Sequence, residues 1–149
     1  MKTKTKIVIF FICVSLFSSL HGQIRSDFVL APVGKTPCIR IDREGKLHAT
    51  WWSGGSVYYG LFDSLGHAIQ TSQRISNSDF TESPRLAIGK DYAVVIWRQR
   101  SLTFNSYIIG QLITISGDTT FENIRFNDDY FDAERFSPDV MYLNDSTFL

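Results

Sequence analysis

The sequence predicts an all-β fold made of four-stranded antiparallel meanders. No window of the chain shows a sustained helical period of apolar residues. Short runs rich in Val, Ile, Thr, Tyr and Trp recur instead, and Gly, Asp and Ser residues separate them. In addition, these runs form two sets whose landmark residues can be aligned with each other.

Each set contains four expected strands joined by short turns, as antiparallel hairpins require. The first set has its strands at 38–41, 47–53, 56–63 and 67–76. The second set has its strands at 85–88, 92–100, 106–115 and 119–127. Consecutive strands within a set are therefore expected to pair with each other.

The two sets share landmarks that indicate an internal repeat. The matched positions are Thr36-Pro37 with Ser83-Pro84 and Ser137-Pro138, Trp51 with Trp97, and Gly66 with Gly117. A period of about 40–50 residues with four strands per unit is typical of a β-propeller blade. The chain then divides into an N-terminal segment 23–36, a first blade 37–83, a second blade 84–137 and the start of a third at 138–149. A β-sandwich is the alternative fold, disfavoured because a sandwich does not require its halves to repeat.

The third repeat predicts that the gene continues beyond this sequence. It opens at Ser137-Pro138, and the equivalent of Trp51 and Trp97 would fall just past Leu149. Two blades and part of a third do not close a ring, since propellers have four or more blades. We therefore expect this chain to be an N-terminal fragment.

Residues 1–22 are expected to be a secretory signal peptide. Lys2, Lys4 and Lys6 precede an apolar run at 7–17, and a short polar end closes at Gly22. The run is shorter than the roughly 20 residues that a bilayer-spanning helix needs, so no transmembrane anchor is expected after cleavage near Gly22–Gln23. The protein is accordingly expected to be secreted, periplasmic or attached to the cell envelope.

The charge of the chain argues against nucleic acid as a partner. The whole sequence has 15 basic and 15 acidic residues, and removal of 1–22 takes away three lysines and no carboxylate. The mature chain is therefore mildly acidic and lacks the basic patch that nucleic-acid binding requires. Cys38 is then the only cysteine, and its apolar neighbours predict a small buried side chain.

The repeat resembles those of secreted bacterial β-propeller proteins, and more loosely the sialidase-like propeller superfamily. Such repeats have a Ser/Thr-Pro start, an Asp-x-x-Gly turn, a tryptophan two residues after an apolar residue and an Asp-Ser-x-Gly turn. Here these are Thr36-Pro37, Asp42-Arg-Glu-Gly45, Ala49-Thr-Trp51 and Asp63-Ser-Leu-Gly66. The resemblance implies an architecture and says little about function, because propellers carry many functions.

The repeat also gives the tryptophans an interpretation. Trp51 and Trp97 occupy one repeat position, so both are expected to pack between blades. Trp52 points to the opposite face beside the Gly54-Gly55 turn. It either packs on the neighbouring blade or is an exposed stacking platform of the kind that sugar-binding sites use.

No catalytic, cofactor or metal motif is present in the sequence. His-Glu-x-x-His, Cys-x-x-Cys, Gly-x-Ser-x-Gly and phosphate-loop patterns are all missing. Asp42, Asp63, Asp79 and Glu82 lie at turns, where carboxylates commonly form caps. The sequence therefore predicts a binding or scaffold protein whose partner is a glycan or a protein. The alternative is a sialidase-like glycan hydrolase with catalytic blades partly outside this chain.

Overall fold

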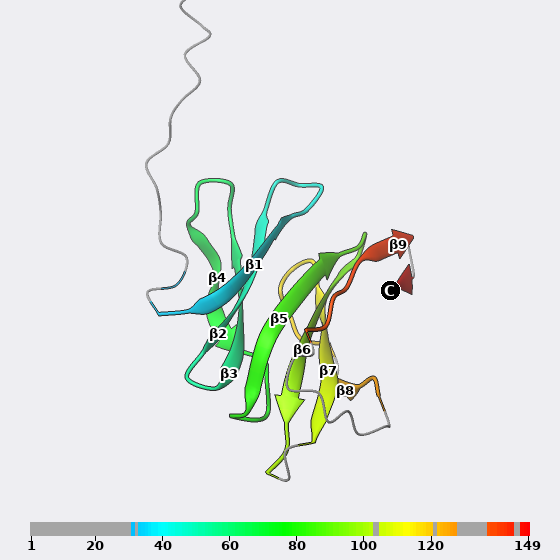
Figure 1. Ribbon diagram of the computed structural model, residues 1–149. Helices are drawn as coiled ribbons and strands as arrows, with labels where there is room; N and C mark the ends of the chain where they lie inside the picture. Colours follow the sequence, from blue (N-terminus) through cyan, green and yellow to red (C-terminus); the bar gives the residue numbers. More distant parts are fainter. Residues whose placement is uncertain (1–30, 32, 103–104, 121, 128–136, 145–146) are drawn as a thin grey trace, which may run out of the picture.

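The computed structural model confirms an all-β protein with antiparallel sheets of four strands. It describes residues 31–149 except 32, 103–104, 121, 128–136 and 145–146, so the predicted signal peptide lies outside the described residues. Strands β1 to β4 form an N-terminal sheet in sequential order, and β5 to β8 form a C-terminal sheet in the same order. A hairpin of β9 and β10 follows (Figure 1). The described residues form no closed ring of sheets.

Most strands coincide with the segments that the sequence predicts. The strands among the described residues are β1 Lys35–Ile41, β2 Leu47–Ser53, β3 Ser56–Phe62, β4 Ala68–Arg74, β5 Thr81–Ile88, β6 Tyr92–Arg100, β7 Ser106–Thr114, β8 Ile124–Arg125, β9 Tyr142–Asn144 and β10 Thr147–Phe148. The predicted strand at 119–127 is wrong in extent. Thr119 makes a single bridge to Ile113, and only Ile124–Arg125 pair with β7. The side chain of Asn123 instead bonds the carbonyl of Ile75, so the chain bends toward the other sheet.

Carboxylate-capped turns join the strands of the N-terminal sheet. Asp42 accepts hydrogen bonds from the backbone N–H groups of Glu44 and Lys46, at 2.9 and 2.8 Å. Asp63 caps the β3–β4 turn in the same way, through Leu65 and His67. Each turn closes on a glycine with positive φ, 81° at Gly45 and 87° at Gly66, which only glycine adopts without strain. Gly117, with φ of 100°, closes the β7 turn.

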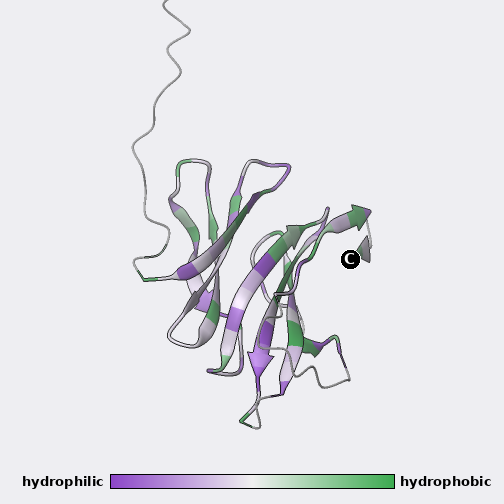
Figure 2. Ribbon diagram, in the orientation of Figure 1, coloured by the Kyte–Doolittle hydropathy of each residue, from purple (hydrophilic) through white to green (hydrophobic). Residues whose placement is uncertain are grey.

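The main hydrophobic core lies between the two sheets. Strand β5 packs against β1, β2 and β3. Hydrophobic residues lie on strands of both sheets (Figure 2). Both sheets contribute to one buried cluster, which comprises Cys38, Val57, Tyr59, Leu61, Ile75, Leu86, Ala93, Val95, Trp97, Ile109 and Ile113. The predicted burial of Cys38 is confirmed. Removing these side chains from water is the main force that holds the sheets together.

The repeat tryptophans lie on corresponding strands but have different surroundings. Trp97 is fully buried between the two sheets. Trp51 lies on the other face of the N-terminal sheet, where it packs with Ala49 and Phe62 and stacks on Tyr58 at 6.0 Å between ring centroids. No second sheet covers this face among the described residues.

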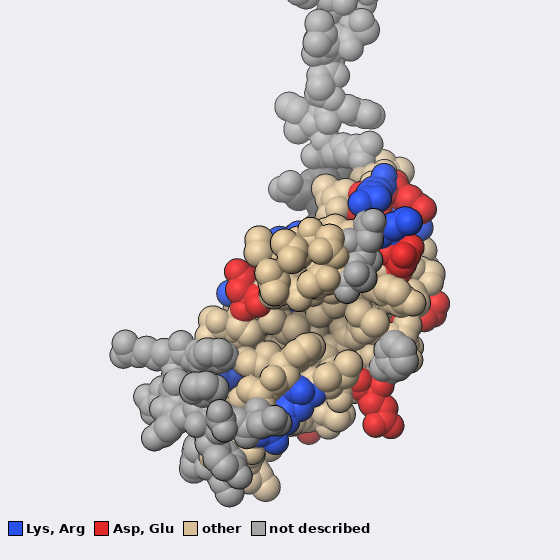
Figure 3. Space-filling model, turned by 90° about the vertical axis from the view of Figure 1, so that its right-hand side faces the viewer, with Lys and Arg blue, Asp and Glu red and all other residues tan. Residues whose placement is uncertain are grey.

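The β9–β10 hairpin covers the far face of the C-terminal sheet. Pro138 precedes it, Val140 is buried, and Phe148 packs near Val94 and Ile96. The charged groups on this side of the molecule lie mainly at its margins, around a broad uncharged area (Figure 3). The described residues contain no helix, and so none long and apolar enough to span a bilayer.

Candidate functional site

A small pocket lies where the starts of β1 and β5 meet the end of β2. It has a volume of about 210 Å³ and is lined by Lys35, Thr36, Trp52, Glu82 and Ser83. We call it the bulge pocket. It combines an aromatic ring, two hydroxyls and two opposite charges. Two further cavities among the described residues, of about 250 and 230 Å³, are lined mainly by apolar side chains. The bulge pocket is therefore the best candidate for a specific polar site.

Two matching β-bulges shape this pocket. Pairing of β1 with β2 shifts between Lys35 and Cys38, and pairing of β5 with β6 shifts between Glu82 and Arg85. The prolines explain both shifts, because Pro37 and Pro84 have no N–H to donate to a ladder. Ladder pairing resumes only after each proline.

The residues before the prolines adopt a strained backbone conformation. Thr36 has φ of 49° and Ser83 has φ of 54°, in the left-handed region that residues with a Cβ seldom adopt. Their hydroxyls face no hydrogen-bond partner within the described residues. Backbone strain of this kind concentrates at functional sites. Its occurrence twice at one pocket therefore supports a binding role for Thr36 and Ser83.

Trp52 forms the aromatic wall of the pocket. It pairs with Lys35 on one side and with Val57 on the other, and its side chain is half-buried. The Lys35 ammonium lies 5.5 Å from the centroid of the Trp52 ring. This distance is within the range of a cation–π contact. The structure thus places Trp52 partly against the neighbouring sheet and partly in a pocket.

Glu82 brings a compensated negative charge to the pocket. Its carboxylate forms an ion pair with Arg98, and the Nε of Arg100 lies 2.9 Å from the same oxygen. The Arg98 side chain is only 5% exposed. The Glu82 side chain is 37% exposed, so its carboxylate lies at the boundary between the protein and the solvent. The two arginines together restrict the position of that carboxylate.

The linker between β4 and β5 sets the position of Glu82 and Ser83 relative to Trp52. Thr81 donates from its backbone N–H and its hydroxyl to the carbonyl of Gly55, at 2.9 and 2.7 Å. Gly55 belongs to the turn that follows Trp52, so this contact fixes the start of β5 beside the end of β2. A Cβ at Gly55 would meet the carbonyl oxygen of Asp79 at 2.1 Å, which requires glycine there.

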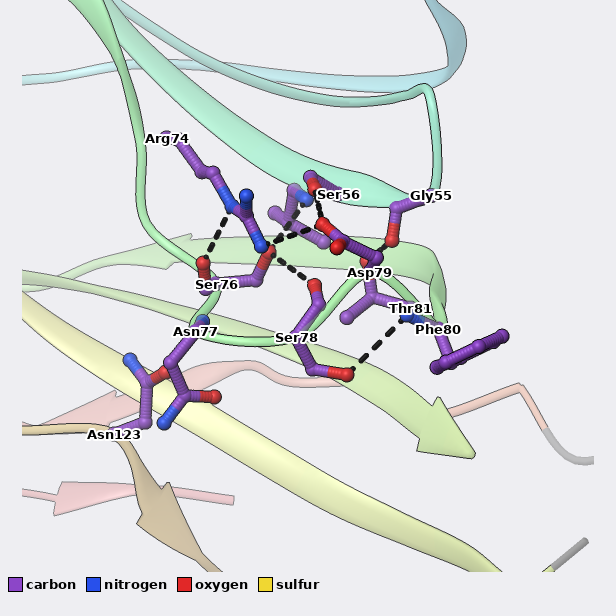
Figure 4. Close-up of polar contacts among 11 residues, drawn as sticks. Gly55, Ser56, Arg74, Ser76, Asn77, Ser78, Asp79, Phe80, Thr81 and Asn123 are labelled. Atoms are coloured by element: carbon purple, nitrogen blue, oxygen red, sulfur yellow. Dashed lines mark hydrogen bonds and ion pairs between the residues drawn. The ribbon is translucent and has the colours of Figure 1, made fainter. Parts of the chain in front are cut away.

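A polar network holds this linker in place (Figure 4). Arg74 pairs with Asp79 at 2.8 Å and donates to the carbonyl of Ser76. The Ser76 hydroxyl accepts from the N–H of Val57, and the N–H of Asn77 donates to the side chain of Asn123, the residue before β8. These contacts satisfy polar groups of a segment that crosses between the sheets, so they hold the linker beside the pocket.

A second buried polar group lies at the opposite end of β2. His48 Nδ1 is 2.7 Å from the Tyr59 hydroxyl, and Nε2 is 3.2 Å from Asp42 Oδ2. Burial lowers the pKa of His48 from its ordinary value although Asp42 acts in the opposite direction. The neutral ring then donates a hydrogen bond from Nε2 to Asp42 and accepts one at Nδ1 from the Tyr59 hydroxyl. Burial also raises the pKa of Tyr59 far above its ordinary value.

The four carboxylates that the sequence predicted at turns all have structural partners, but the prediction is wrong for Glu82, which lies in strand β5 and pairs with β6. Asp42 caps its turn and contacts His48, and Asp63 caps its turn and contacts His67 at 3.0 Å. Asp79 pairs with Arg74, and Glu82 with two arginines. No cluster of three or more metal-ligating side chains occurs in the described parts of the chain.

Sequence reasoning singled out Trp52 but missed its companions in the pocket. Lys35 and Glu82 carry no motif, and Glu82 reaches the pocket only because β5 packs on β2. The Thr36-Pro37 and Ser83-Pro84 pairs were the sequence signal that could have revealed the pocket, because each proline marks a β-bulge. Comparison with protein families, curated proteins and solved structures finds no match to this chain.

Proposed function

We propose that this protein is an exported binding module of the β-propeller type, and that the bulge pocket is its ligand site. The proposal rests on the residues that meet in this pocket. They are Trp52, Lys35, Glu82 and the two hydroxyl residues with positive φ, Thr36 and Ser83. The pocket combines an apolar wall with a few fixed polar groups, which is the usual composition of a small-ligand site. The carboxylates of Asp42, Asp63 and Asp79 already hold structural contacts in their turns, which favours binding over catalysis.

The blade assignment is supported by the connectivity of the two sheets. Each sheet is a strictly sequential meander, whereas the strands of a sandwich are typically connected across the two sheets. Both sheets also begin with the same Ser/Thr-Pro bulge, and both have a tryptophan near the end of the second strand. The third Ser-Pro pair precedes the β9–β10 hairpin, which packs on the face of the C-terminal sheet that points away from the N-terminal sheet.

The proposal of export rests on the lysine-rich start and short apolar run of residues 1–22. Expression in a secreting host should therefore give a mature protein that begins within a few residues of Gln23. Intact-mass spectrometry of the exported material measures this directly. A protein that retains Met1 and stays with the membrane fraction would contradict export and leave the pocket proposal untouched.

Ligand binding should depend on Trp52. Titration calorimetry of the whole protein against neutral oligosaccharides, acidic oligosaccharides and peptides identifies a ligand. Trp52→Ala should then weaken binding about tenfold or more, equal to about 1.4 kcal/mol, because stacking on the ring is lost. Lys35 is exposed, so Lys35→Ala is a second variant that should fold normally.

Tyr92→Ala is the matched control for this experiment. Tyr92 is an exposed aromatic residue at the opposite end of β6, away from the bulge pocket. Its replacement should leave affinity unchanged. If no probe binds, or if binding is insensitive to both Trp52→Ala and Lys35→Ala, the pocket is not the ligand site.

A further inference from the structure

The charge balance of the bulge pocket points to the class of its ligand. The negative charge of Glu82 is compensated by two arginines, Arg98 and Arg100. The neighbouring Arg74–Asp79 pair is balanced as well. Lys35 has no carboxylate partner within the described residues, where its ammonium lies over the Trp52 ring. The uncompensated charge of the pocket is therefore positive.

The Lys35 ammonium is also free to be recruited by a ligand. A cation–π contact at an exposed site is weaker than a charge-assisted hydrogen bond. An anionic group entering the pocket can thus draw the ammonium from the Trp52 ring. The same movement uncovers the ring for a flat apolar partner. Lys35 and Trp52 together match a ligand with a negative substituent beside a stacking surface.

The remaining groups match a polyhydroxylated ligand. The hydroxyls of Thr36 and Ser83 lack partners within the described residues, and both line the pocket. Glu82 is held by its arginines and can accept hydrogen bonds from ligand hydroxyls. A pocket of about 210 Å³ suits a single sugar ring rather than a folded partner. The ends of a longer chain would extend beyond it into solvent.

We infer that the bulge pocket binds one ring of an anionic polysaccharide, with a carboxylate or sulfate group paired to Lys35 and the ring face against Trp52. This inference rests on the proposed function, because it assigns a ligand class to the same pocket. Carboxylate and sulfate present the same chemistry to an ammonium. The test therefore uses one pair of probes for the carboxylate and another pair for the sulfate.

The experiment compares charged and uncharged versions of the same sugar chain on the whole protein. Calorimetry is run with oligogalacturonate and its methyl ester, and with sulfated dextran oligosaccharide and plain dextran oligosaccharide. At least one charged probe should bind ten times more tightly than its uncharged counterpart. Its affinity should fall as salt is raised, because the charge pair is screened. The arm with the larger preference identifies the anionic group.

Two variants locate the preference at the pocket. Lys35→Gln should bring the ratio of charged to uncharged affinity close to one, and Lys90→Gln, at the exposed β5–β6 turn, should leave the ratio unchanged. A charged preference that survives Lys35→Gln would overturn the inference. Equal binding of charged and uncharged sugars, or binding of peptides only, would overturn it too, while Trp52-dependent binding would keep the proposed function. Failure of every probe to bind would count against both.

Discussion

Trp97→Ala is expected to lower the free energy of unfolding by about 3–5 kcal/mol. The Trp97 side chain is fully buried in the core shared by the two sheets, where it packs with Val95 and Ile109. Truncation removes this apolar contact and leaves a cavity that the rigid sheets cannot close. The loss should appear as a lower midpoint in urea with an unchanged slope, because the surface exposed on unfolding barely changes.

Two further substitutions make this result diagnostic. Trp97→Phe should cost much less than Trp97→Ala, because it keeps a ring and removes an indole N–H that has no partner in the described part of the chain. Trp52→Phe should also cost less, because Trp52 is only half-buried. Small and equal effects of Trp97→Ala and Trp52→Phe would show that Trp97 is not in the core.

The local pattern of the sequence was enough to predict most of the strands. The predicted ranges 47–53 and 92–100 match β2 and β6 to the residue. Both strands have a continuous run of β-forming residues, and turns bound both of them. The range 119–127 failed because Asn123 bonds across to the neighbouring sheet. That contact depends on how the sheets pack, so no local pattern reveals it.

The sequence could predict only the part of the candidate site that follows from the pattern of a single strand. The alternation of β2 separates Trp52 from Trp51 on opposite faces, and sequence alone shows this. The pairing of Glu82 with Arg98 depends on the register of β5 and β6, which the bulge at Ser83 shifts. The bulge pocket further requires β5 to lie on β2. Three-dimensional packing thus determines the residues that sequence reasoning missed.

The buried His48 should make the protein less stable in mild acid. Its pKa is lowered on folding from 6.5, so the unfolded chain binds a proton more readily than the folded chain. The stability from the neutral ring is complete above pH 6.5 and is lost as pH falls through the lowered pKa. Asp42 adds a second loss at lower pH. Burial alone would raise its pKa, but the N–H groups of Lys46 and Glu44 and the His48 ring outweigh burial and lower it below 3.8.

His48→Leu tests this account at two levels. At neutral pH it should destabilise the protein by about 1–3 kcal/mol for each buried group left without its partner, the Asp42 carboxylate and the Tyr59 hydroxyl. It should also flatten the dependence of unfolding free energy on pH just below 6.5, because the titrating ring is gone. Urea titrations at a series of pH values measure both effects.

Tyr59→Phe separates the titration from the hydrogen bond. It removes the hydroxyl that donates to Nδ1 but keeps the ring that buries His48. Stability should therefore fall by about 1 kcal/mol at every pH, and the loss of stability below pH 6.5 should persist. If His48→Leu keeps the wild-type pH dependence while Tyr59→Phe abolishes it, the His48 ring is not the group that titrates. If all three proteins respond identically to acid, His48 is not held neutral by burial in the folded chain.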